Sequence, residues 1–125
     1  MKDSWYWKAG LHDAKIRSVS EKAQAADWKN GIPACRCLEI LLKSGSAYER
    51  DIRKIILFDA HIRELKREGE SADLGAFTDA HWQSDRLTEL AEKGFFLELE
   101  AVDSEDSTLY LCVEFETAKV EHSGQ

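Results

Sequence analysis

The sequence predicts an all-β fold, or a β-dominated α+β fold, built as an antiparallel sandwich or a partly open barrel. Two observations predict this fold: a six-residue signature recurs along the chain, and polar turns separate segments rich in Ile, Leu, Val, Phe and Tyr. A length of 125 residues is enough for one hydrophobic core and too short for two ordinary domains. We therefore expect a single domain over residues 1–125, with at most one helix.

The signature has three copies, which read LHDAKI at residues 11–16, LFDAHI at 57–62 and FETAKV at 115–120. A second similarity links LEILL at residues 38–42 with LELEA at 97–101. Two motifs repeated in the same order favour an internal duplication of a strand unit. The alternative is convergence, because strands draw on few residue types.

The apolar positions of the signature are spaced by three residues and then by two, as in Leu57, Ala60 and Ile62. In a regular strand, residues two apart share a face and residues three apart lie on opposite faces. A strand that buries all three must bulge or bend, which we expect near residues 58–59 and 116–117. Such a bend lets a long strand leave one sheet and continue in another.

In chain order, residues 22–31 are polar and rich in alanine, which predicts a loop or strand end. We expect Trp28 to fold back from this segment as a lid on the core. Four strands follow at residues 35–42, 52–62, 95–102 and 108–120, because their aliphatic and aromatic side chains suit a pleated sheet. Pro33 lies at the start of the first of these strands, where a missing backbone N–H is tolerated.

Polar turns separate these strands. Residues 43–46 mark the turn of a first hairpin, and residues 102–108 join the last two strands in a second hairpin. Residues 64–76 are charged and contain glycine, so they predict a solvated loop.

Residues 78–93 fit two structures. Asp79 could cap a helix over residues 79–92, which Gly94 would end. The alternative is a strand over residues 82–90 that turns at 92–94 into the next strand. The close turn and the β-rich surroundings favour the strand slightly.

The composition excludes several classes of protein. Three cysteines, an odd number, suit a reducing compartment, and Cys35 and Cys37 lack the spacing of a metal or redox motif. Every apolar run is shorter than the roughly 20 residues of a membrane span. The N-terminal segment has an acid and aromatic residues where a signal peptide needs an apolar stretch. We therefore expect a soluble, cytoplasmic protein with no cofactor and no membrane partner.

The charge is divided unevenly along the chain. Residues 1–67 contain 14 Lys and Arg against 9 Asp and Glu, whereas residues 68–125 contain 3 against 15. Nucleic acid is not an expected partner, because phosphate binding needs clustered basic side chains and the net charge is −7. The division instead predicts a protein partner that docks on the acidic half, or electrostatic self-association such as a homodimer.

Six residues are candidates for a binding surface: Trp5, Trp7, Trp28, Trp82, Asp59 and His61. Tryptophan is common in binding hot spots and on sugar platforms, although plugging the open end of the fold is the favoured structural alternative. Asp59 and His61 share a strand face, so they could form a carboxylate–imidazole pair. The favoured alternative is that Asp59, like Asp13, binds backbone N–H groups at a bend.

The opening pattern W-x-W-K-x-G-L-H-D-A-x-I over residues 5–16, with CLEI at 37–40 and KIILF at 54–58, resembles a family of small bacterial proteins with no assigned activity. The resemblance covers most of the chain. It implies a bacterial, stand-alone, single-domain protein, and it supplies no catalytic or binding residue.

The sequence favours a non-enzymatic binding or accessory module that interacts with another protein, because we find no catalytic, metal-binding or cofactor-binding constellation. An acidic antidote that covers a basic toxin or enzyme is one version of this function. The alternative from another class is a small hydrolase or carbohydrate-binding protein that uses Asp59, His61 and the tryptophans.

Overall fold

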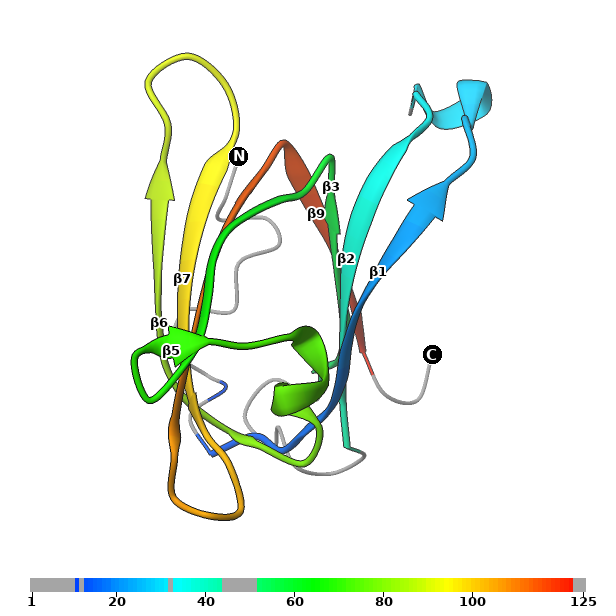
Figure 1. The fold of residues 1–125 in the computed structure, drawn as a ribbon. Coiled ribbons are helices and arrows are strands. Elements are labelled where there is room, and N and C mark those ends of the chain that lie inside the picture. The colour runs from blue at the N-terminus through cyan, green and yellow to red at the C-terminus, as the bar shows by residue number, and fades with distance from the viewer. Residues whose placement is uncertain (1–10, 12, 32, 44–51, 123–125) are drawn as a thin grey trace.

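The computed structural model describes residue 11 and residues 13–31, 33–43 and 52–122. Two antiparallel sheets pack face to face as a sandwich that is not closed into a barrel (Figure 1). The predicted antiparallel all-β fold is confirmed in its sandwich form. The longest helical element of the described residues has four residues, so the helix considered over residues 79–92 is wrong and the strand is right.

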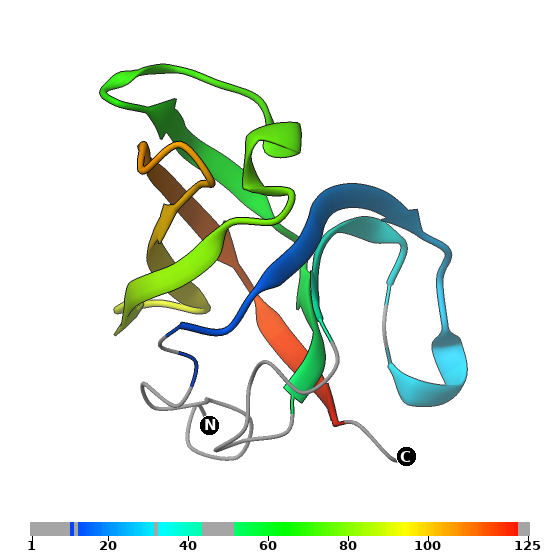
Figure 2. The ribbon, with the colours of Figure 1, turned by 90° about the horizontal axis from the view of Figure 1, so that it is seen from below.

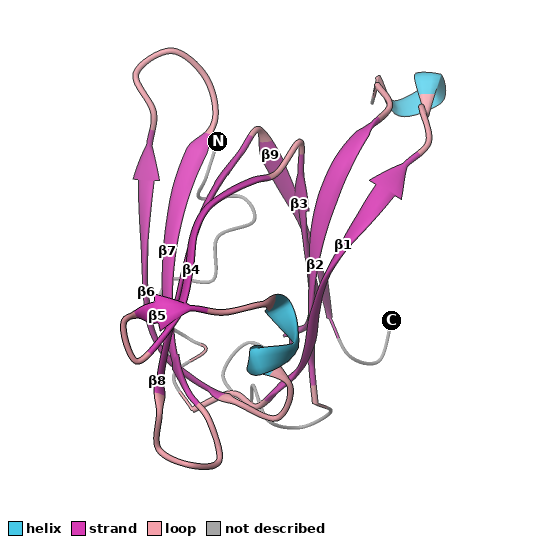
Figure 3. Ribbon diagram, in the orientation of Figure 1, coloured by secondary structure: helices cyan, strands magenta, loops and turns pink. Residues whose placement is uncertain are grey.

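In both sheets, most neighbouring strands are also consecutive in the chain (Figure 3). The four-stranded sheet has the order β1 (Ile16–Gln24), β2 (Cys35–Leu42), β3 (Ile52–Phe58) and β9 (Thr117–His122). The five-stranded sheet has the order β5 (Glu70–Ser71), β4 (His61–Arg67), β8 (Thr108–Phe115), β7 (Phe95–Val102) and β6 (His81–Glu89). Two short 3-10 helices, η2 (Trp28–Asn30) and η3 (Leu74–Phe77), complete the described elements.

The chain changes sheets at both predicted bends. β3 ends in the four-stranded sheet at Phe58, and β4 begins in the five-stranded sheet at His61. β8 and β9 make the reverse passage around Glu116, whose backbone N–H donates to the Phe58 carbonyl at 2.9 Å. The two passages therefore cross at one corner of the sandwich, which we call the β3–β4 corner.

A fourth copy of the signature, FTDAHW at residues 77–82, was missed in the sequence. It pairs with the first copy at another corner, where the Asp13 N–H donates to the Trp82 carbonyl at 2.7 Å. The Trp82 N–H donates in turn to the Ala14 carbonyl at 2.8 Å. Asp79 has a positive φ of 66°, close to the 67° of Asp13 and the 54° of Asp59. Three of the four copies thus reverse the chain with an aspartate in the left-handed region.

The strands of the two sheets are connected in the same way. The order β1-β2-β3-β9 corresponds to β6-β7-β8-β4, so three successive strands lie in one sheet and the strand that follows them in the chain lies in the opposite sheet. Register irregularities fall at matching places, between Ile16 and Ser18 in β1 and between Trp82 and Ser84 in β6. The similar segments 38–42 and 97–101 lie in the corresponding strands β2 and β7.

One hydrophobic core lies between the sheets and includes residues from both. η3 lies between the sheets at one end of the sandwich, where it buries Phe77 completely (Figures 1 and 2). The solvated loop predicted over residues 64–76 is partly wrong. β4 continues to Arg67, because Leu65 packs against the core while its neighbours Glu64 and Lys66 face outwards.

Candidate functional site

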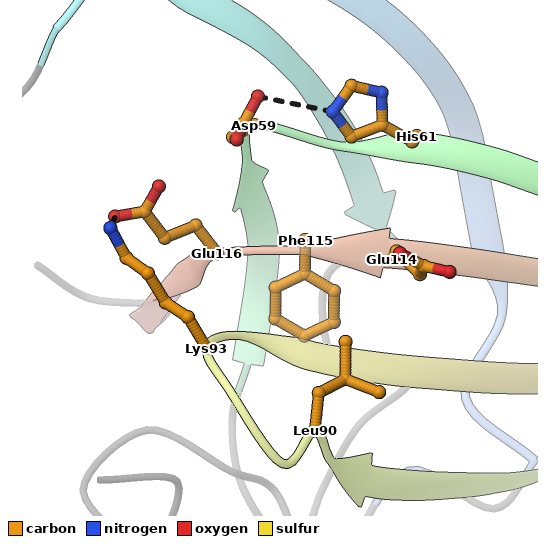
Figure 4. Close-up of a pocket in the computed structure, with 7 residues that line it drawn as sticks. All are labelled: Asp59, His61, Leu90, Lys93, Glu114, Phe115 and Glu116. Carbon is orange, nitrogen blue, oxygen red and sulfur yellow. Dashed lines mark ion pairs between the residues drawn. The ribbon is translucent and has the colours of Figure 1, made fainter.

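Two pockets flank the β3–β4 corner and share Asp59 and Glu116 in their linings. The first, the charged pocket, has a volume of about 140 Å³ (Figure 4). Its lining consists of Asp59, His61, Leu90, Lys93, Glu114, Phe115 and Glu116. Leu90 and Lys93 come from the β6–β7 loop, so the pocket lies between that loop and the corner.

Polar and charged contacts link the side chains of this pocket to one another and to Arg63. His61 Nε2 lies 3.3 Å from Asp59 Oδ1, and Lys93 Nζ lies 3.0 Å from Glu116 Oε1 (Figure 4). Arg63 binds Glu114 with two hydrogen bonds, Nε to Oε1 at 3.0 Å and an NH₂ group to Oε2 at 3.2 Å. These bonds lower the pKa of Glu114 below its ordinary value. Among the described residues that line the charged pocket, none is a serine, threonine or cysteine.

The second pocket, the hairpin pocket, has a volume of about 200 Å³. Its lining consists of Gly31, Pro33, Ala34, Cys35, Phe58, Asp59, Glu116 and Thr117. Gly31 has a positive φ of 69°, which ends η2 and turns the chain towards β2. The pocket therefore lies between the returning arm of the β1–β2 hairpin and the β3–β4 corner.

The two pockets occupy corresponding places in the two sheets. Phe58 and Glu116 hold the same position of the signature, and so do Asp59 and Thr117. The connecting loops differ, because residues 25–34 join β1 to β2 whereas residues 90–94 join β6 to β7. The longer loop carries η2, which lies at the far end of the β1–β2 hairpin (Figure 1).

Trp28 is 77% exposed at the start of η2, and it is the exposed large hydrophobic side chain of the described residues. Its predicted role as a lid on the core is therefore wrong. The tip is held by local bonds: Asn30 Nδ2 donates to Asp27 Oδ2 at 2.7 Å, and the Gly31 N–H donates to the Trp28 carbonyl at 3.3 Å. An ordered turn thus presents an indole to solvent.

Cys35 and Cys37 of β2 are two residues apart, and Cys37 is buried. Burial, together with the neighbouring Cys35 thiol, raises the pKa of Cys37 to about 11. A thiol with a raised pKa stays protonated at neutral pH, so it is a poor nucleophile and a poor metal ligand. Cys35 lines the pocket and contributes a small apolar surface there.

The structure brings together some of the residues predicted for the site. Asp59 and His61 form the carboxylate–imidazole pair considered in the sequence, and Trp28 lies on the hairpin whose returning arm lines the hairpin pocket. Trp82 is fully buried, and its indole N–H donates to Asp85 Oδ1 at 2.9 Å, so it is part of the core. Trp5 and Trp7 lie outside the described residues.

Several residues of the two pockets were not predicted. Phe58 and Glu116 occupy the second position of the signature, which varies among the copies and therefore carried no signal. The sequence predicts only that Pro33 lies at the start of a strand, and it gives no sign that Pro33 lines a pocket.

Within the described ranges, no group of three or more His, Cys, Asp and Glu side chains could hold a metal ion. In the same part of the chain, no helix has the length and apolar character needed to cross a membrane. Comparisons with models of known protein families, with curated proteins and with solved structures found no match.

Proposed function

We propose that this chain is a non-enzymatic module that binds another protein through the hairpin surface, defined as Trp28, Lys29 and the hairpin pocket. The observation that carries the proposal is the 77% exposure of Trp28 on the same hairpin end as Pro33 and Ala34, which line a pocket. An exposed indole on an ordered turn is typical of a binding hot spot, because its large apolar area is buried only when a partner arrives.

The difference between the two pockets supports this assignment. An internal duplication would explain the matching strand orders, and the β1–β2 loop is longer than the corresponding β6–β7 loop. Loops on a rigid scaffold commonly carry function. The longer loop is also the one that carries Trp28, so the hairpin surface is one of the parts in which the two halves of the chain differ.

The charge supports a protein partner over nucleic acid. Asp59 and Glu116 line the hairpin pocket, and the whole chain has a net charge of −7. Phosphate groups would be repelled by these carboxylates. The free cysteines Cys35, Cys37 and Cys112 agree with a reducing compartment such as the cytoplasm.

The test is affinity capture from the cell of origin, with the wild type, Trp28→Ala and Thr88→Ala as tagged baits. Thr88 is exposed on β6 and serves as the control. We expect the wild type and Thr88→Ala to retain the same protein and Trp28→Ala to lose it. Equal recovery by all three baits would overturn the proposal.

The Asp59–His61 pair favours a second candidate, a small hydrolase or carbohydrate-binding protein. An imidazole 3.3 Å from a carboxylate can act as a general base, although it would need a water nucleophile in this pocket. The test is a screen of ester, phosphoester and glycoside substrates and a glycan array, with Asp59→Asn as the paired variant. Turnover or glycan binding that Asp59→Asn abolishes would support this candidate over the first.

A further inference from the structure

We infer that the partner of the hairpin surface is a second copy of this chain, with Trp28 of each copy inserted into the hairpin pocket of the other. This inference rests on the proposed function, because it names the occupant of the same surface. Three observations carry it: the size of the pocket, the charges beside Trp28 and around the pocket, and the position of both on one hairpin.

The size of the hairpin pocket suits an aromatic side chain. An apolar cavity of about 150 Å³ is known to hold benzene, and the hairpin pocket has a volume of about 200 Å³. Pro33, Ala34 and Phe58 supply apolar contacts for a ring. Thr117 and Glu116 also line the pocket, where they could accept the indole N–H, which needs a partner when it is buried.

The charges beside Trp28 and around the pocket are complementary. Lys29 follows Trp28 in η2, and both are exposed. Among the described residues that line the pocket for Trp28 of the other copy, Asp59 and Glu116 carry charge and both are acidic, while Lys93 Nζ lies 3.0 Å from Glu116 Oε1. An ammonium group would therefore arrive next to carboxylates, which favours this orientation over one that faces Lys29 towards other cations.

The position of both parts on one hairpin makes the contact reciprocal. Trp28 precedes the first pocket residue, Gly31, by three positions, so a two-fold axis near the hairpin end can bring both Trp28 side chains to both pockets. An isologous interface of this kind closes at two copies and forms no filament. The expected product is a homodimer.

The dependence of association on salt concentration distinguishes this dimer from one held together by charge. Head-to-tail association between basic and acidic halves would weaken at high salt, because salt screens exposed charges. The Trp28 contact is mainly apolar, and two copies of net charge −7 repel each other. We therefore expect the homodimer to persist at high salt.

Sedimentation velocity over a range of concentrations, at physiological and high salt, tests the inference. We expect a dimer for the wild type and for the control Thr88→Ala, and a monomer for Trp28→Ala. Loss of two reciprocal hot-spot contacts should raise the dimer dissociation constant at least about 100-fold. Lys29→Glu, a change on the exposed turn, should weaken the dimer to a smaller extent.

Mixing two variants provides a sharper test. Ala34→Phe fills the pocket and leaves Trp28 in place, so it should be monomeric alone. A mixture of Ala34→Phe with Trp28→Ala retains one intact contact and should form heterodimers, which neither variant does by itself. Circular dichroism and the melting temperature of each variant report whether it is folded.

A wild type that stays monomeric at every concentration would overturn self-association. The wider proposal would then still stand if capture of another protein depended on Trp28. A dimer that survives in Trp28→Ala would overturn this interface. If Ala34→Phe fails to fold, Trp28→Ala and Lys29→Glu decide the question alone.

Discussion

Asp59 has an unusual backbone conformation and also a carboxylate that contacts His61. Its φ of 54° is in the left-handed region, which costs an ordinary residue about 1–2 kcal/mol and which aspartate adopts more readily than most. Its carboxylate lies 3.3 Å from His61 and lines both pockets. Asp13 and Asp79 have similar φ values at the same signature position, so the conformation belongs to the chain reversal and is independent of the pairing with His61.

Substitutions of Asp59 can separate the effect of its positive φ from the effect of its carboxylate. Asp59→Gly should keep the free energy of unfolding within about 0.5 kcal/mol, because glycine adopts a positive φ without strain. Asp59→Val should lower it by about 1–2 kcal/mol, because a β-branched residue resists this region. Thr117→Val, at the matching position without a positive φ, is the control and should have little effect. Urea unfolding measures all three, and equal losses for Gly and Val would contradict this explanation.

The two described tryptophans have opposite roles. Trp82 is fully buried and donates to Asp85, so Trp82→Ala should lower the free energy of unfolding by about 3–5 kcal/mol. Trp82→Phe keeps a ring but loses the N–H donor, and should cost about 1–3 kcal/mol. Trp28→Ala should change stability by less than about 0.5 kcal/mol, because its side chain is exposed. A large loss of stability in Trp28→Ala would show that the tip belongs to the core.

At the scale of elements, the β6–β7 turn shows how closely the corner packs. Gly94 has a φ of 93°, and a Cβ at this position would lie 2.7 Å from the Phe115 carbonyl oxygen. Gly69 also has a positive φ, of 80°, but its Cβ would meet nothing within 4 Å. The two glycines thus separate backbone strain from a steric clash at the charged pocket.

We predict that Gly69→Ala lowers the free energy of unfolding by about 1–2 kcal/mol through backbone strain alone. Gly94→Ala should add about 1–3 kcal/mol for the clash, because the obstructing atom belongs to the backbone and cannot rotate away. Denaturant midpoints of the two variants give the comparison. Equal midpoints would mean that β8 does not approach the turn as closely as the structure has it.

The contacts of Asp103 in the β7–β8 turn predict how the stability of the fold depends on pH. Asp103 Oδ2 accepts a bond from Arg67 Nε at 2.8 Å, and Oδ1 accepts from the N–H groups of Glu105 and Ser107, each at 2.9 Å. These bonds hold the pKa of Asp103 below its ordinary value of 3.8 in the folded state. The carboxylate therefore stabilises the fold above about pH 4, and this contribution is lost as the pH falls through the lowered pKa.

Asp103→Asn should accordingly be less stable than the wild type at neutral pH and should lose less stability on acidification to about pH 3. Urea unfolding at both pH values measures the difference, and Ser104→Ala, an exposed change on the same turn, is the control. A pH profile for Asp103→Asn parallel to that of the wild type would contradict the assignment.

Some elements could be predicted from the sequence because their burial pattern is local. β2 and β7 have the predicted bounds, since inward aliphatic residues alternate along each. Both sheet changes followed from the spacing of the signature, in which Ala60 must be buried together with Leu57. The predicted strand ends at residue 62, whereas β4 continues to Arg67. The prediction is too short because the outward residues of β4 are charged and only Leu65 faces inwards in its second half.

The remaining features depend on contacts between distant residues. The hairpin pocket joins residues 31–35 to residues 58–59 and 116–117, and no local pattern indicates that these three segments meet. The exposure of Trp28 follows from where the lengthened hairpin projects, which composition does not reveal. The Asp59–His61 pair was predictable only in part: a shared strand face placed the side chains together, but not the pocket around them.

At the scale of the whole molecule, two similar halves share their strand order and differ in their connections. Each half contributes three successive strands to one sheet and a fourth strand to the other, so both corners are fixed by the same signature. The shared scaffold leaves the loops as the variable part, and the ten residues 25–34 form the one that presents Trp28 beside a pocket. The binding function that we propose for the chain therefore depends on this hairpin end.

The most direct test of that claim is photo-crosslinking in the cell of origin, with a photoreactive phenylalanine analogue in place of Trp28. The same analogue in place of Thr88, on the outer surface of β6, is the reference. We predict covalent adducts from position 28, with the chain itself as the adduct partner if the homodimer forms, and none from position 88. Adducts from position 88 with none from position 28 would show that the binding surface lies elsewhere on the sandwich.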